Sequence, residues 1–100
     1  MVCYHLIKIT KSTRPDKKLM AIFEDCNTGM RKTTHFGAAG MSDFTLHKDP
    51  ERKKRYIMRH SKNESWNNPV TAGSLSRWIL WNKPTLKASI SDYKKRFHFK

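Results

Sequence analysis

The sequence predicts an α+β domain in which a three-stranded antiparallel β-meander is followed by three helices packed on one face of the sheet. The first third of the chain alternates like strands between turn-forming residues, whereas the residues after 49 change to a helical period. A chain of 100 residues has the size of one domain. Residues 1–100 are therefore expected to form a single small basic α+β domain.

Three strands are expected in order, with a short turn between each pair. YHLIKIT (4–10) is rich in apolar and β-branched residues, and LMAIFED (19–25) is apolar on both faces, which is typical of a central strand. Pro15-Asp16 and CNTG (26–29) supply turn formers. MRKTTHFGA (30–38) then completes the meander.

Helix signals begin at Asp49-Pro50-Glu51, which combines a capping acceptor, a proline for the first helical position and an acid for the first turn. This predicts a helix that runs to about residue 62. A second helix is expected over residues 72–82, capped by Thr71 or Ser74. It contains the most apolar stretch of the chain.

The last helix is expected to begin after Thr85, because Lys83-Pro84 breaks the preceding one. It carries an apolar stripe at positions i, i+4, i+7 and i+11, which is the helical period. The residues of this stripe are Leu86, Ile90, Tyr93 and Phe97.

The segment HFGAAGMSDFTLHKD (35–49) joins the two halves. Its small residues suggest a phosphate cradle, but the lysine and hydroxyl that follow the last glycine of a P-loop are missing. His47-Lys48-Asp49 also lacks the spacers of the phospholipase D-type signature. The segment is therefore predicted to be a structural crossing, with Gly37 and Gly40 for tight backbone and Asp49 as a helix cap.

Positive charge is the strongest chemical signal, with 21 Lys+Arg against 8 Asp+Glu and a formal net charge of +13. Such a surface favours polyanions: nucleic acid, acidic lipid headgroups or an acidic protein face. Arg52, Arg55 and Arg59 lie at i, i+3 and i+7, on one face of the expected helix, and such a row can follow phosphates. The alternative is a solvated helix face that only keeps a small basic protein soluble. The predicted polyanion-binding residues are Lys48, Arg52, Lys53, Arg55, Arg59, Lys62, Lys94, Lys95 and Arg96.

Three tryptophans add aromatic surface to this charge. Trp78 fits the core stripe of its helix, which leaves Trp66 and Trp81 as candidate exposed anchors for a partner. Sequence-specific base reading is not predicted, because the chain has no helix-turn-helix, zinc-finger or RNA-binding aromatic motif.

No catalytic residue, metal site, cofactor or small-molecule substrate is predicted. His60, Asn63 and Glu64 faintly resemble His–Asn–His nucleases, and a polar helix end is the preferred interpretation. The five histidines have no metal-ligand spacing, and a zinc site between His5 and His35 is a minor alternative.

Two cysteines, Cys3 and Cys26, do not make a disulfide framework. The preferred interpretation is two reduced, buried thiols in an intracellular protein, and pairing is the alternative if the first two strands align. No segment approaches the roughly 18 apolar residues of a membrane span.

Nearly the whole chain resembles a family of short basic proteins of nucleocytoplasmic large DNA viruses, including phycodnaviruses and mimivirus relatives. The resemblance rests on THFGAAGMSDFTLHKD, RKKRYIMRHSKNESW and NPVTAGSLSRWILWNKPTLKASISDYKKRF. It carries over no active-site residue. It implies a viral product made in infected cells and packaged.

Small size, charge, the lack of a catalytic set and this resemblance favour a non-enzymatic virion component. This would be a minor capsid or capsid-associated internal protein that cements neighbours and docks on acidic surfaces through its basic helix. Its expected partners are other viral capsid proteins, with DNA or an inner membrane surface as further acidic neighbours. Its expected location is the virion, and the host cytoplasm or nucleus during infection. The alternative is a sequence-nonspecific nucleic-acid-binding accessory protein of a large DNA virus.

Overall fold

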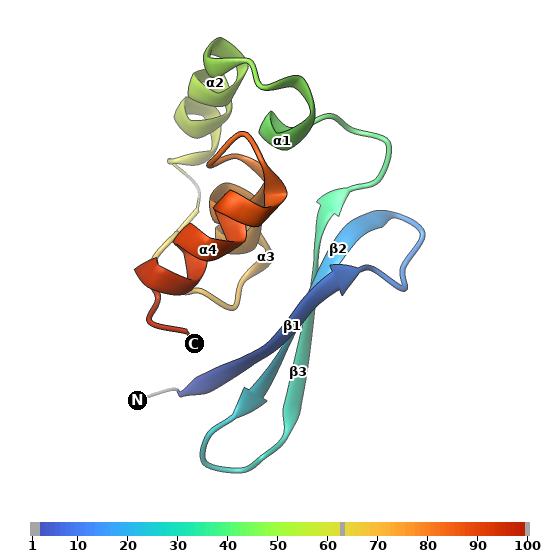
Figure 1. Cartoon of the computed structure of the whole chain (residues 1–100), viewed down its shortest axis with the longest axis vertical. Coiled ribbons are helices and arrows are strands. Elements are labelled where there is room, and N and C mark those ends of the chain that lie inside the picture. Colours follow the sequence, from blue (N-terminus) through green and yellow to red (C-terminus); the bar gives the residue numbers. More distant parts are fainter. Residues whose placement is uncertain (1–2, 63, 100) are drawn as a thin grey trace.

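A computed structural model describes residues 3–62 and 64–99 and confirms the predicted α+β architecture (Figure 1). A three-stranded antiparallel sheet comes first, and the helices gather on one side of it. The elements in chain order are β1 (Tyr4–Lys11), β2 (Lys17–Asp25), β3 (Arg31–Ala38), α1 (Phe44–His47), α2 (Pro50–His60), α3 (Ala72–Leu75), the π-helix η1 (Ser76–Leu80) and α4 (Leu86–Arg96).

The sheet has the order β1-β2-β3, so β2 is the central strand, as its two apolar faces predicted. Leu6 is opposite Phe23 in the first pair, and Leu19 is opposite Phe36 in the second. The register of β1 shifts between Leu6 and Lys8, which marks a bulge at Ile7. The β2–β3 turn closes through Gly29, whose N–H donates to the Asp25 carbonyl over 2.9 Å.

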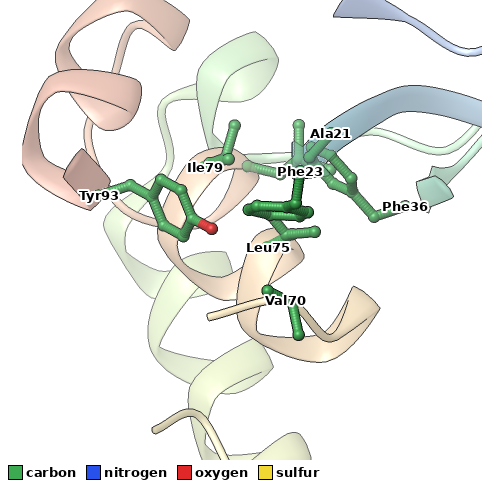
Figure 2. Close-up of a cluster of buried hydrophobic side chains, with 8 residues drawn as sticks. Ala21, Phe23, Phe36, Val70, Leu75, Ile79 and Tyr93 are labelled. Carbon is green, nitrogen blue, oxygen red and sulfur yellow. The ribbon is translucent and has the colours of Figure 1, made fainter. Parts of the chain in front are cut away.

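The core lies between one face of the sheet and the helices after residue 69 (Figure 2). Ala21 and Phe23 are fully buried on β2. Met30 had been assigned to the third strand with Phe36, but it precedes β3 and is 72% exposed. The buried cluster consists of Ala21, Phe23, Phe36, Val70, Leu75, Ile79, Leu80 and Tyr93.

The expected helix over 72–82 is shorter and less regular than predicted. Thr71 caps it, as one of the two expected candidates, by accepting from the Ser74 N–H over 3.2 Å. After Leu75 the helix widens into η1 and ends at Leu80. Single π-turns of this kind interrupt α-helices for local packing or functional reasons.

The last helix, α4, begins where the sequence predicted, with the Thr85 hydroxyl accepting from the Ala88 N–H over 3.1 Å. Only Tyr93 of its apolar stripe is fully buried, and its hydroxyl donates to the Pro69 carbonyl over 2.7 Å. Burial raises the pKa of this phenol. Leu86, at the other end of the stripe, is 37% exposed.

Cys3 and Cys26 form a disulfide, so the preferred prediction of two reduced thiols was wrong. The β1–β2 register places Tyr4 opposite Asp25, and the next step along both strands brings the cysteines to a Cα separation of 5.3 Å. This distance lies within the usual range for a bridge. The first two strands therefore align, which was the condition for the alternative prediction that the cysteines pair.

Reducing this disulfide is expected to lower the free energy of unfolding by about 3 kcal/mol, because the bridge closes a loop with a sequence separation of 23. Urea denaturation with and without a phosphine reductant measures the difference. The double variant C3S/C26S should match the reduced protein and should not respond to reductant. Equal stability in all four samples would show that the bridge contributes nothing.

Among the described residues, no helix has both the length and the apolar character needed to cross a bilayer.

Candidate polyanion-binding surface

The helix α2 carries the predicted arginine row, and its start is built as the sequence indicated. The carboxylate of Asp49 accepts from the Glu51 N–H over 3.0 Å, and Pro50 occupies the first turn. Glu51 lies in the positive end of the helix dipole, while Arg59 and His60 lie in the negative end. Together, the cap and the first-turn residues determine where α2, and with it the arginine row, begins.

Asp49→Ala is expected to lower the free energy of unfolding by about 1 kcal/mol, because the Glu51 N–H loses its acceptor. Chemical denaturation monitored by tryptophan fluorescence measures the change. Asp49→Ser keeps a capping oxygen and should recover most of the stability. A polyanion-binding defect at unchanged stability would instead give Asp49 a direct functional role.

One face of α2 packs against the residues that follow η1, among them Trp81 and Asn82. The ring of Tyr56 stacks on Trp81 with centroids 4.3 Å apart, and His60 stacks on Tyr56 at the same centroid distance. Lys53 donates from Nζ to the Asn82 carbonyl over 2.8 Å. Burial raises the pKa of Tyr56 to about 12, so this phenol stays protonated at neutral pH.

A neighbouring face of α2 presents the exposed side chains of Arg52, Arg55 and Arg59. Each arginine directly precedes a residue of the packed face (Lys53, Tyr56 or His60), so the same i, i+3, i+7 spacing produces both an attached and an exposed stripe. None of the three takes part in a salt bridge with any carboxylate in the described part of the chain, residues 3–62 and 64–99. We call these three residues the arginine face.

Lys53 does not belong to the arginine face, although it was predicted among the polyanion-binding residues. Its ammonium lies 4.9 Å from the centroid of the Phe44 ring and is bound to a carbonyl. Burial, followed by the charges of Arg77 and Lys83, lowers its pKa. The sequence gives the charge of Lys53, which was expected to widen the row, but does not show which side of the helix is packed.

Lys48 and Lys62 flank the arginine face and are both exposed. Lys48 has a left-handed backbone (φ 55°) at the end of α1. Its Nζ donates to the carbonyls of Thr45, over 2.8 Å, and Pro84, over 2.7 Å. Lys48 therefore joins the crossing segment to the start of α4, and its charge is less available than that of Lys62.

The cations predicted at the end of α4 lie in three different settings. Lys94 lines a groove beside β1, and Lys95 is exposed. The guanidinium of Arg96 lies 3.8 Å from the centroid of the Trp78 ring and 3.5 Å from an Asp92 carboxylate oxygen. Arg96 is therefore partly committed to local contacts.

The two predicted aromatic anchors are both half-buried within the helical half. Trp81 stacks on Tyr56 and lies 5.3 Å from the His47 ring. Trp66 donates from Nε1 to Glu64 over 3.0 Å. Neither indole extends into solvent as an anchor would, because each contacts another side chain of the same chain. The spacing of residues in the sequence does not show these contacts.

The crossing segment has the structural role that was predicted for it. Gly37 has φ 79°, and a Cβ there would lie 2.6 Å from the Leu80 Cδ1 atom, so only glycine fits without displacing that side chain. The short helix α1 within the segment was not predicted. Asp43 caps it, accepting from the Thr45 N–H over 2.9 Å, and also accepts from Lys18 Nζ over 2.5 Å.

A cleft of about 420 Å³, which the sequence did not predict, lies where the crossing segment meets α2 and η1. Its charged residues are mostly paired: Lys18 with Asp43 at 2.5 Å, and His60 with Glu64 at 3.4 Å. Glu64 also accepts from the indole of Trp66. The carboxylates of Asp43 and Glu64 therefore hold neighbouring parts of the fold together.

The nuclease alternative involved His60 and Glu64 at this cleft, together with Asn63, which lies outside the described residues. The described residues contain no group of three His, Cys, Asp or Glu side chains placed to hold a metal ion. His35 and His5 occupy different register positions, opposite Met20 and Glu24. The ring of His35 instead forms a 2.7 Å hydrogen bond with the Ser12 hydroxyl.

Comparison with family models matches residues 7–60 to a family described as a family of unknown function (DUF5754). The match begins within β1 and covers the rest of the sheet, the crossing segment and α2. Neither the curated proteins nor the solved structures contain a match to this chain.

Proposed function

The chain belongs to the DUF5754 family, whose function is unknown, and we propose that it is a non-enzymatic virion component that docks on an acidic neighbour through the arginine face. In this proposal it is a minor capsid or capsid-associated internal protein. It cements neighbouring capsid proteins, and the acidic surface it meets belongs to one of them, to packaged DNA or to an inner membrane. Its place is the virion, after synthesis in the infected cell.

The observation that carries the proposal is the pairing state of Arg52, Arg55 and Arg59. They are exposed on one helix face, and no described carboxylate pairs with them. A guanidinium can bind carboxylate or phosphate through two parallel hydrogen bonds. A rigid row of three at helical spacing suits a surface with several anionic groups better than a single small ligand.

Two further features support a role in a particle. The resemblance of the chain to short basic proteins of large DNA viruses supports a product made in infected cells. The Cys3–Cys26 bridge is of a kind that persists in oxidising settings, which include virion surfaces.

Quantitative proteomics of purified virions tests the location. The protein is expected among the packaged proteins at a copy number that is constant between preparations. Carboxylate-to-lysine cross-linking of intact particles should then join Lys54 or Lys62, which are exposed beside the arginine face, to acidic residues of a neighbour. Absence from virions that contain the other capsid proteins would refute the particle role.

Sequence-nonspecific nucleic-acid binding is the second candidate, and the same arginine row favours it. Each phosphate contact releases counterions, so DNA binding should weaken steeply as salt rises. Tight DNA binding by a protein that is missing from virions would support an accessory role in replication or genome compaction. Negligible DNA binding at low salt would exclude it and leave an acidic protein or membrane as the docking surface.

A further inference from the structure

The outer edge of β1 is a surface of the described part of the molecule that has no assigned role. The sheet order makes β1 an edge strand, and its pairing within the described sheet is with β2 alone. The other edge strand, β3, is partly covered: it contacts α3, and the Thr34 hydroxyl donates to the Val70 carbonyl over 2.8 Å. An open edge strand presents unpaired N–H and C=O groups that another strand can use.

A groove runs between this edge and α4, which lie next to each other in Figure 1. It consists of two adjoining hollows of about 290 and 610 Å³, and both are lined by Ile90 and Lys94. Ile7, at the bulge in β1, lines one hollow and is 40% exposed, and Leu86 lines the other and is 37% exposed. The groove therefore offers an apolar floor directly beside the open strand edge.

The charge of the groove selects the kind of occupant. Its cations are Lys8, Lys87 and Lys94, and no carboxylate lines either hollow. A second copy of this chain would bring the same lysines and a net charge of +13 to the contact, so self-association at this edge is disfavoured. An acidic segment would be attracted.

We propose that β1 binds an extended acidic segment of a partner protein as a fourth antiparallel or parallel strand. Main-chain hydrogen bonds to the β1 edge would supply part of the affinity. Alternate apolar side chains of the segment would fill the groove against Ile7, Leu86 and Ile90, and its carboxylates would meet Lys8, Lys87 and Lys94. This site is separate from the arginine face, so a protein with both would hold two neighbours at once.

The probe for the test is a fluorescent peptide of roughly eight residues, a common strand length, with alternating valine and glutamate. Fluorescence anisotropy measures its affinity for the full chain, with the disulfide intact. Two companion peptides separate the contributions: one has N-methyl groups on alternate backbone nitrogens, and one contains glutamate only. Both are expected to bind at least about tenfold more weakly than the first, because they lack strand pairing or apolar contacts.

The charge-reversal variant K87E/K94E is expected to bind the valine–glutamate peptide about tenfold more weakly, or weaker still. The matched control K32E/K83E makes the same change in net charge at exposed residues that do not line the groove. It should shift the affinity by less than about twofold. Circular dichroism establishes that both variants are folded.

Amide chemical-shift mapping supplies a readout that needs no variant: the peptide should perturb residues 4–11 and the α4 residues that line the groove, from Leu86 to Lys94. Equal binding of all three peptides, equal effects of the two charge variants, or perturbations confined to α2 would each overturn the proposal. Neutralising the arginine face should leave peptide binding unchanged, so failure at one surface is distinguishable from failure at the other.

Discussion

Replacing Arg52, Arg55 and Arg59 together by glutamine is expected to weaken binding to duplex DNA or to heparin by on the order of 100-fold at low salt. The three guanidinium groups are exposed and lack described carboxylate partners, so a polyanion is free to contact all of them. If each one contacts a phosphate, the slope of log affinity against log salt concentration should fall by about 2.7. Anisotropy titrations between about 50 and 200 mM salt measure both quantities.

The matched control is K11Q/R31Q/K32Q, which also removes three exposed positive charges but takes them from the sheet. If binding depends only on net charge, the two triple variants will lose the same affinity and slope, and the arginine face has no special role. The single variant Lys53→Gln provides a further contrast. Because Lys53 is bound to the Asn82 carbonyl, its loss should affect stability more than polyanion binding.

Local signals predicted the element boundaries well where a single residue supplies the hydrogen bond. Asp49, Thr71 and Thr85 each cap a helix, because a short polar side chain before a helical run has few other uses. The central position of β2 followed from its two apolar faces. These features depend on neighbours in sequence, so the sequence alone was enough to find them.

The features that could not be predicted depend on which face of an element packs. Lys53 and Arg52 are adjacent and equally charged, and Lys53 alone of the two contacts Asn82 and Phe44 on the packed side. Trp81 became a partner of Tyr56 in the same way. The disulfide depended on the strand register, which the apolar pattern constrained without fixing.

The widening of the second helix into η1 likewise had no sequence signal. Leu75, Ile79 and Leu80 follow an ordinary helical spacing, and all three are buried in the core. The π-turn ends at Leu80, whose side chain lies against Gly37 of the crossing segment. Such adjustments arise from tertiary packing and appear only once both elements are in place.

Phe23→Ala is expected to lower the free energy of unfolding by about 3–5 kcal/mol, the usual cost of removing a buried phenylalanine ring. Phe23 is fully buried on β2, the central strand of the sheet. Its ring centroid lies 6.0 Å from that of Tyr4 and 5.9 Å from that of Phe99, so it joins the sheet to the end of the chain. Such a loss is a large part of the total stability of a domain this size, and the melting temperature should fall by roughly 15 °C or more.

Ile22→Ala is the matched control, since Ile22 is the next residue of the same strand, points to the opposite face and is only half-buried. Calorimetry and urea denaturation should show a much smaller loss for Ile22→Ala than for Phe23→Ala. Comparable losses would mean that the second face of the sheet is also covered in solution. Because the helices pack on the Phe23 face, that cover would have to come from outside the described fold, and the sheet rather than α2 would become the main docking surface.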